Sequence, residues 1–211
     1  MHKTLQAMLA VACILAAVPA LALPPEPPAK VYVPGNQKKF QKGVDAYDAG
    51  DYKRAFEIFS DLADNDDIAA LRNVALMERK GLGTPRDVKA AIRDYKKAAE
   101  AGLPTAAADL GQMLYDGETG PRDPKAALPW LKIAAAASHP VAQFLLAQMY
   151  EYGEGGLKQN YDKAEKLYAA AAAHGDIRAL YRLSYLKGWP APNRTPPPDR
   201  SARNTQQDGN P

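Results

Sequence analysis

Residues 142–155 of the chain read AQFLLAQMYEYGEG, an apolar stretch that ends in closely spaced glycines. The stretch belongs to a unit that recurs along the chain, because alanine returns at a stride of 36, 36 and 37 residues. One alanine set is Ala70, Ala106, Ala142 and Ala179, and a second set is Ala55, Ala91, Ala127 and Ala164. A period in the thirties is typical of a stacked array, in which each unit buries its apolar face against its neighbours.

The first half of each unit has the pattern of a helix. Apolar side chains follow the first alanine set by four and seven residues, the spacing of one helix face, and the residue after the aliphatic position is small. The aliphatic column is Val74, Leu110, Leu146 and Leu183; the small column is Ala75, Gly111, Ala147 and Ser184; the third column is Met77, Met113, Met149 and Leu186. Gly81, Gly117 and Gly153 predict the helix end, because glycine adopts left-handed backbone at little cost.

The second half of each unit predicts another helix, opened by an N-cap four residues before the second alanine set. The predicted caps are Asp51, Asp87, Asp123 and Asn160, whose side-chain oxygens can accept the free amide protons of the first turn. A bulky column and a further alanine column follow at four-residue steps: Phe59, Tyr95, Leu131 and Tyr168, then Ala63, Ala99, Ala135 and Ala172. Gly102, Gly175 and, at the matching place, Ser138 predict the end of this helix, and Pro129 predicts a bend.

These patterns predict an all-α fold, a right-handed α-solenoid of helix-turn-helix repeats over residues 37–188. We expect four helical pairs and one terminal helix from about Asp176 to Lys187. The pairs begin near Lys38, Asp67, Pro104 and Pro140. The unpaired last helix is expected to cover the exposed apolar face of the last pair, as terminal caps do in solenoids.

The two ends of the chain differ from the array. Residues 1–22 read as a signal peptide, with Lys3 before an apolar stretch and the small-x-small site Ala20-Leu21-Ala22. We expect cleavage after Ala22, export to the bacterial periplasm or the medium, and no stable membrane insertion afterwards. Residues 23–36 predict a proline-rich linker and residues 189–211 a proline-rich disordered tail.

Composition narrows the possible functions. The 27 basic and 24 acidic side chains nearly balance, which argues against a nucleic-acid surface. The single cysteine lies in the signal peptide, so no disulfide framework is expected. Ser138 beside His139 is the one candidate catalytic pair, but no nucleophile motif surrounds it. His139 and His174 are weak candidates for metal ligands, because no cysteine or paired carboxylate lies near them in the sequence. We therefore expect no catalytic residues, no cofactor and no metal.

The columns resemble the Sel-one-like repeat family, relatives of tetratricopeptide repeats. The family pattern is best matched by Ala142, Leu146, Ala147, Met149, Tyr150, Gly153 and Gly155. Glu78 and Leu114 depart from it where the pattern has tyrosine, and Asp66 departs from it where the pattern has glycine. The resemblance implies an α-solenoid that binds proteins or peptides without chemistry. Some exported relatives are credited with penicillin or peptidoglycan binding, but their cysteine pairs are missing here.

First-helix positions outside the buried columns predict a partner-binding face on the concave side of the array. Stacked helices would align aromatic, amide and charged groups there, a mixture suited to peptide capture. The predicted face consists of Arg72, Leu76, Arg79, Gln112, Tyr115, Phe144, Gln148, Glu151, Tyr181 and Tyr185. The alternative is that Phe144, Tyr181 and Tyr185 pack between helices.

The resulting functional hypothesis is an exported adaptor that binds a protein or peptide, with its oligomeric state open. One alternative is an envelope enzyme, β-lactamase-like, or a peptidoglycan-binding protein, in which Ser138 would be required. Another is a luminal adaptor of a eukaryotic secretory pathway, which the last residues, Gln207 to Pro211, disfavour because they hold no retention signal.

Overall fold

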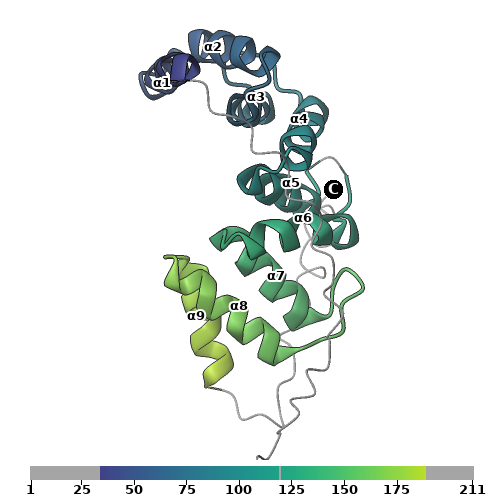
Figure 1. The fold of residues 1–211 in the computed structure, drawn as a ribbon. Coiled ribbons are helices and arrows are strands. Elements are labelled where there is room, and N and C mark those ends of the chain that lie inside the picture. The colour runs from purple at the N-terminus through teal and green to yellow at the C-terminus, as the bar shows by residue number, and fades with distance from the viewer. Residues whose placement is uncertain (1–33, 119, 189–211) are drawn as a thin grey trace, which may run out of the picture. The chain divides into compact units, whose positions relative to one another are not determined.

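The computed structural model describes residues 34–118 and 120–188, and these residues form nine α-helices (Figure 1). The predicted signal peptide, most of the linker and the tail lie outside the described residues. The helices are α1 (Pro34–Asp48), α2 (Tyr52–Asp64), α3 (Ile68–Lys80), α4 (Val88–Glu100), α5 (Pro104–Asp116), α6 (Pro124–Ala136), α7 (Pro140–Tyr152), α8 (Tyr161–Ala173) and α9 (Ile177–Lys187). The first helix begins four residues before Lys38.

Helices that follow one another in sequence pack against one another throughout the described part of the chain. The strongest contacts join α1 with α2, α3 with α4, α5 with α6 and α7 with α8, so the units are antiparallel helix pairs (Figure 1). The ninth helix packs on α8, and no helix follows it within the residues that the structure describes. The expected four pairs and terminal helix are therefore confirmed.

The helix ends follow the chemistry that the sequence predicted. The side chains of Asp51, Asp87, Asp123 and Asn160 each accept a hydrogen bond from the backbone N–H three residues later. Gly81, Gly117 and Gly153 end the first helices in the left-handed conformation, with φ of 69°, 75° and 71°. These caps satisfy backbone groups that a helix end leaves without partners.

The ends of the second helices require left-handed backbone in every unit, even where the residue is not glycine. Gly102 and Gly175 have φ of 91° and 87°, and Asp66 and Ser138 adopt φ of 65° and 62° at the same place. The turn between units is thus imposed by the packing of the pairs. Pro129 lies inside α6, which runs through it without interruption from Pro124 to Ala136.

The repeating columns form the core. Both alanine sets are fully buried, as are the bulky residues of the second helices. Gly111 shows how close the helices of a pair lie, because a Cβ there would sit 2.7 Å from Leu131 Cδ2 of α6. In α9 the columns are incomplete, since Leu186 is buried but Leu183 is half-buried and Ser184 is exposed.

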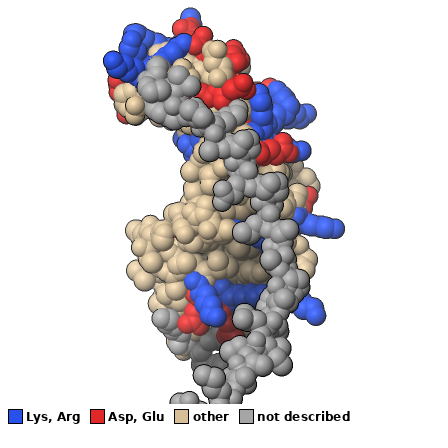
Figure 2. Space-filling view, viewed as in Figure 1, with Lys and Arg blue, Asp and Glu red and all other residues tan. Residues whose placement is uncertain are grey.

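Charged side chains are unevenly distributed over the array. Figure 2 shows Lys, Arg, Asp and Glu gathered over α1–α4, whereas the middle of the same face, over α5–α7, holds few of them. None of the described helices is both long enough and apolar enough to cross a membrane.

Candidate partner-binding surface

The ten residues of the predicted face are divided between core and surface. Tyr115, Phe144, Gln148 and Glu151 are buried, so their side chains pack between helices and are not offered to a partner in this arrangement. Tyr181 is exposed. The remaining five are half-buried: Arg72, Leu76, Arg79, Gln112 and Tyr185. Partner binding by the accessible six stays a prediction.

Several of these side chains connect neighbouring units. Arg72 Nε of α3 donates to Asp109 Oδ2 of α5 at 2.7 Å. Arg79 Nε donates to Glu118 Oε2 at 2.9 Å, and 36 residues later the hydroxyl of Tyr115 donates to Glu154 Oε2 at 2.7 Å. Arg79 and Tyr115 occupy the same position of the repeat, so this position links successive units by an ion pair in one case and by a hydrogen bond from a phenol in the other.

Tyr115 is buried by the turn that follows its own helix. The guanidinium of Arg122 lies over the Tyr115 ring, 4.4 Å from its centroid, and Arg122 Nε donates to the Tyr115 carbonyl at 3.1 Å. Burial raises the pKa of Tyr115, and its bond to the Glu154 carboxylate raises it further. The phenol is therefore a neutral hydrogen-bond donor at physiological pH.

Glu151 is the centre of a buried polar network at the C-terminal end of the array. Its Oε2 accepts a hydrogen bond from the Tyr168 hydroxyl of α8 at 2.7 Å, and its Oε1 pairs with Arg182 of α9. Arg182 also donates to the Tyr152 hydroxyl at 2.7 Å. Burial and the Glu151 carboxylate raise the pKa of Tyr168. This network joins α7, α8 and α9.

Phe144 belongs to the same packed region. Its ring lies 5.6 Å from the Tyr168 ring, centroid to centroid, and the Arg178 guanidinium of α9 lies 4.3 Å from its centroid. The alternative that Phe144 packs between helices is the arrangement observed.

An exposed apolar surface on α9 was missed by the sequence reasoning, except for Tyr181, which was predicted as part of the partner-binding face. We call it the α9 face: Ile177, Leu180, Tyr181 and Ser184, of which the first three are 80%, 59% and 70% exposed. The available signal was that the sequence predicts no second helix to pair with α9, since Leu71, Ala107 and Gln143, the equivalents of Leu180, are buried in units that have both helices.

A carboxyl pair between α3 and α4 was also missed. Burial and, after it, the neighbouring Asp94 carboxyl together raise the pKa of Glu78 to about 7. Burial likewise raises the pKa of Asp94. Glu78 occupies the position at which the family pattern has tyrosine, so the departure itself was the signal.

The two residues considered for catalysis differ in exposure. Ser138 is exposed in its left-handed turn, whereas His139 Nδ1 is buried without a hydrogen-bond partner, and burial lowers the pKa of His139. Across residues 34–118 and 120–188, no three His, Cys, Asp or Glu side chains gather as metal ligands would.

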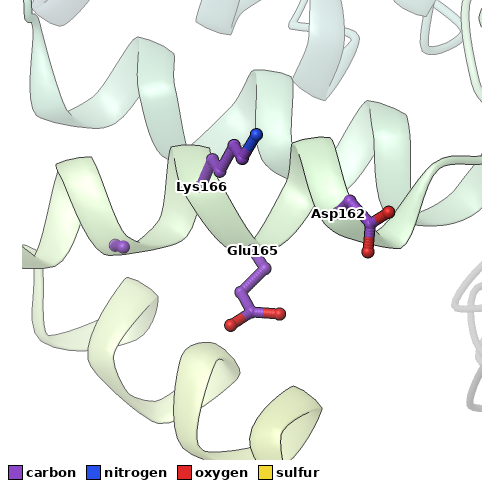
Figure 3. A pocket seen from close by; sticks show the side chains of 4 residues that line it. Asp162, Glu165 and Lys166 are labelled. Carbon is purple, nitrogen blue, oxygen red and sulfur yellow. The ribbon is translucent and has the colours of Figure 1, made fainter. Parts of the chain in front are cut away.

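One hollow of about 340 Å³ lies along α8, lined by Asp162, Glu165, Lys166 and Ala169. Figure 3 shows the Asp162, Glu165 and Lys166 side chains pointing in different directions, with Glu165 aimed toward α9. These three groups therefore do not converge on one point in the hollow.

Taken together, the paired helices and their unit-to-unit bonds define a helical-repeat scaffold. The Sel1 repeat model matches residues 68–103, 104–139, 140–176 and 177–196. The chain therefore belongs to the Sel1 repeat family.

Solved bacterial structures share this fold. A Sel1 repeat protein from Oxalobacter formigenes is 31% identical with a TM-score of 0.64, and the match covers 69% of this chain and 59% of that protein. A protective antigen of uropathogenic Escherichia coli with an SLR fold is 25% identical with a TM-score of 0.66, and the match covers 72% of this chain and 34% of that protein. An immunity protein from Pseudomonas aeruginosa is 23% identical with a TM-score of 0.54, and the match covers 74% of this chain and 60% of that protein. The chain thus covers less than two thirds of the length of each of these three proteins. Comparison with curated proteins found no match.

Proposed function

We propose that this protein is an exported, non-catalytic adaptor of the bacterial envelope that binds a protein or peptide partner through its first helices. One observation supports the proposal above the others: α3, α5 and α9 keep arginine, amide and tyrosine side chains accessible at three positions of the repeat. These side chains are Arg72, Arg79, Gln112, Tyr181 and Tyr185.

These side chains have the chemistry of a protein-binding surface. Arginine and tyrosine are enriched at interfaces, because each combines a large contact area with hydrogen-bonding groups. Arg72 and Arg79 are already held in place by Asp109 and Glu118, so little side-chain freedom would be lost when a partner binds.

Photo-crosslinking in bacterial cells would test the proposal. A photoreactive residue at Gln112 of α5 should capture a discrete partner, whereas one at exposed Lys96 of α4 should not. N-terminal sequencing of the exported protein would test cleavage after Ala22. Binding is then measured with the purified partner.

The double variant Arg72→Ala, Tyr185→Ala should weaken that binding at least tenfold while the helical circular dichroism signal is kept, although Tm should fall by a few degrees because Asp109 loses its ion-pair partner. The matched control is Lys96→Ala, Lys97→Ala on the opposite helix of the pair. Equal binding by both variants, or unfolding of the first, would contradict the proposal.

A further inference from the structure

Within the described residues, the array ends in half a unit. The family model matches three full units and then only residues 177–196, and α9 is the last helix among the described residues. In the preceding unit, the column of Tyr181 is occupied by Phe144, which packs on Tyr168 of the second helix. The column of Ser184 is occupied in an earlier unit by Gly111, which lies against Leu131 of its second helix. The α9 face is therefore the surface on which a second helix packs.

The opposite end of the array is built differently. Over residues 36–48 of α1, the exposed residues are polar or charged: Gln37, Lys38, Lys39, Gln41, Lys42, Asp45 and Asp48. Its aromatic side chains, Phe40 and Tyr47, pack onto the core instead. A polar outer face is what a solenoid end needs in water. The apolar α9 face lacks this property, so it resembles an interface from which one side is missing.

We propose that the α9 face binds an amphipathic helix of a partner protein, which completes the last unit. The chain's own second helices show the required chemistry: a small residue, a Tyr, Phe or Leu four residues later, and a small residue after four more. The bulky side chain would lie over Ser184, and the small residues would let the helix approach Leu180 and Tyr181. This inference rests on the proposed function, of which it names one site and the kind of partner.

Two other occupants fit the α9 face less well. The segment 189–211 of this chain contains six prolines and no alanine followed four residues later by a bulky side chain, so its sequence does not predict a helix with the pattern. A second copy has no such helix to offer, because the pattern residues of its own second helices are buried in their units. A partner's helix remains.

The first experiment uses a fluorescent peptide of residues 160–175, which carries the pattern at Ala164, Tyr168 and Ala172, and the purified protein. Fluorescence anisotropy should show saturable binding that Leu180→Ser, Tyr181→Ser weakens at least tenfold. Both side chains are exposed, so the fold should be unaffected. Ile133→Ser, at another exposed apolar residue, should change the affinity less than twofold. The same peptide with Tyr168→Ser should bind at least tenfold more weakly.

A chimera provides a second measurement, because isolated short helices form poorly in water. Residues 190–211 are replaced with residues 153–175, which keeps the 37-residue register. Its Tm should rise by about 3 °C or more, the shift expected for about 1 kcal/mol in a domain of this size. The rise should be lost when the grafted tyrosine is replaced by serine.

Four outcomes would overturn the inference. They are an unchanged Tm in the chimera, equal weakening by Ile133→Ser, a wild-type dimer that Leu180→Ser, Tyr181→Ser dissociates, and peptide binding seen only after residues 189–211 are deleted. The third would assign the α9 face to a second copy and the fourth to the tail. If crosslinking at Gln112 still captures its partner, the proposed adaptor function survives any of these results.

Discussion

Replacing Glu151 with glutamine should destabilise the array more than any other change of one charge. The side chain of Glu151 is 1% exposed and that of Arg182 is 13% exposed, so the ion pair lies in the interior. Glutamine keeps the size and can still accept the hydrogen bond from Tyr168. The substitution therefore removes the charge with little change in packing.

The magnitude follows from what is left behind. Arg182 would stay buried with its positive charge and without a carboxylate, and loss of one partner of a buried pair costs about 3–5 kcal/mol. We expect a loss of unfolding free energy at the lower end, about 3 kcal/mol, because glutamine keeps the bond to Tyr168 and Arg182 keeps its bond to the Tyr152 hydroxyl. The matched control is Glu100→Gln in the exposed pair with Lys96, where both side chains are more than half exposed and the loss should be about 0.5 kcal/mol or less.

Urea unfolding followed by circular dichroism would measure both losses. A double-mutant cycle with Arg182→Met should recover much of the loss, because the second change removes the stranded charge. A loss below about 1 kcal/mol for Glu151→Gln, or strict additivity in the cycle, would refute the assignment of Glu151 and Arg182 as a coupled buried pair.

Three further expectations concern the core, a helix cap and pH. Leu146→Ala should cost about 2–5 kcal/mol of unfolding free energy, since Leu146 is buried, whereas a loss under 1 kcal/mol would place that column at the surface. Asp123→Ala should cost about 1 kcal/mol, and Asp123→Ser should restore most of it, if the cap on Ala126 stabilises α6. The pKa of Glu78 is about 7 in the folded state and 4.5 in the unfolded state, so between these two pH values the folded state binds more protons. Glu78 therefore stabilises the folded state fully below pH 4.5, and this stabilisation is lost as the pH rises through 7. Glu78→Gln should flatten this dependence in urea unfolding at pH 5 and 8, while Glu57→Gln should not.

The parts of the structure that the sequence predicted are those that every unit shares. Ala142 and Tyr168 could be assigned to the core because the same position is small or bulky in each copy, and Asp123 could be assigned as a cap for the same reason. The network of Glu151 could not be predicted, because only this unit places a carboxylate there, where the equivalent residues are Arg79 and Tyr115. A single copy gives no periodic signal.

The position of a unit within the array decides whether its polar and aromatic residues are available for binding. The first helix of an inner unit has neighbours before, beside and after it, and α7 accordingly buries Phe144, Gln148 and Glu151 as well as its alanines. In α9 the columns of Gln143 and Phe144 hold Leu180 and Tyr181, which are exposed because no second helix packs beside them among the described residues. A pattern averaged over the repeats therefore identifies the core correctly but assigns the same surface to every unit. The surface that a unit offers to a partner should instead depend on the position of that unit in the array. The end of the array should offer apolar contacts, and the inner units should offer the accessible parts of their arginine and amide side chains.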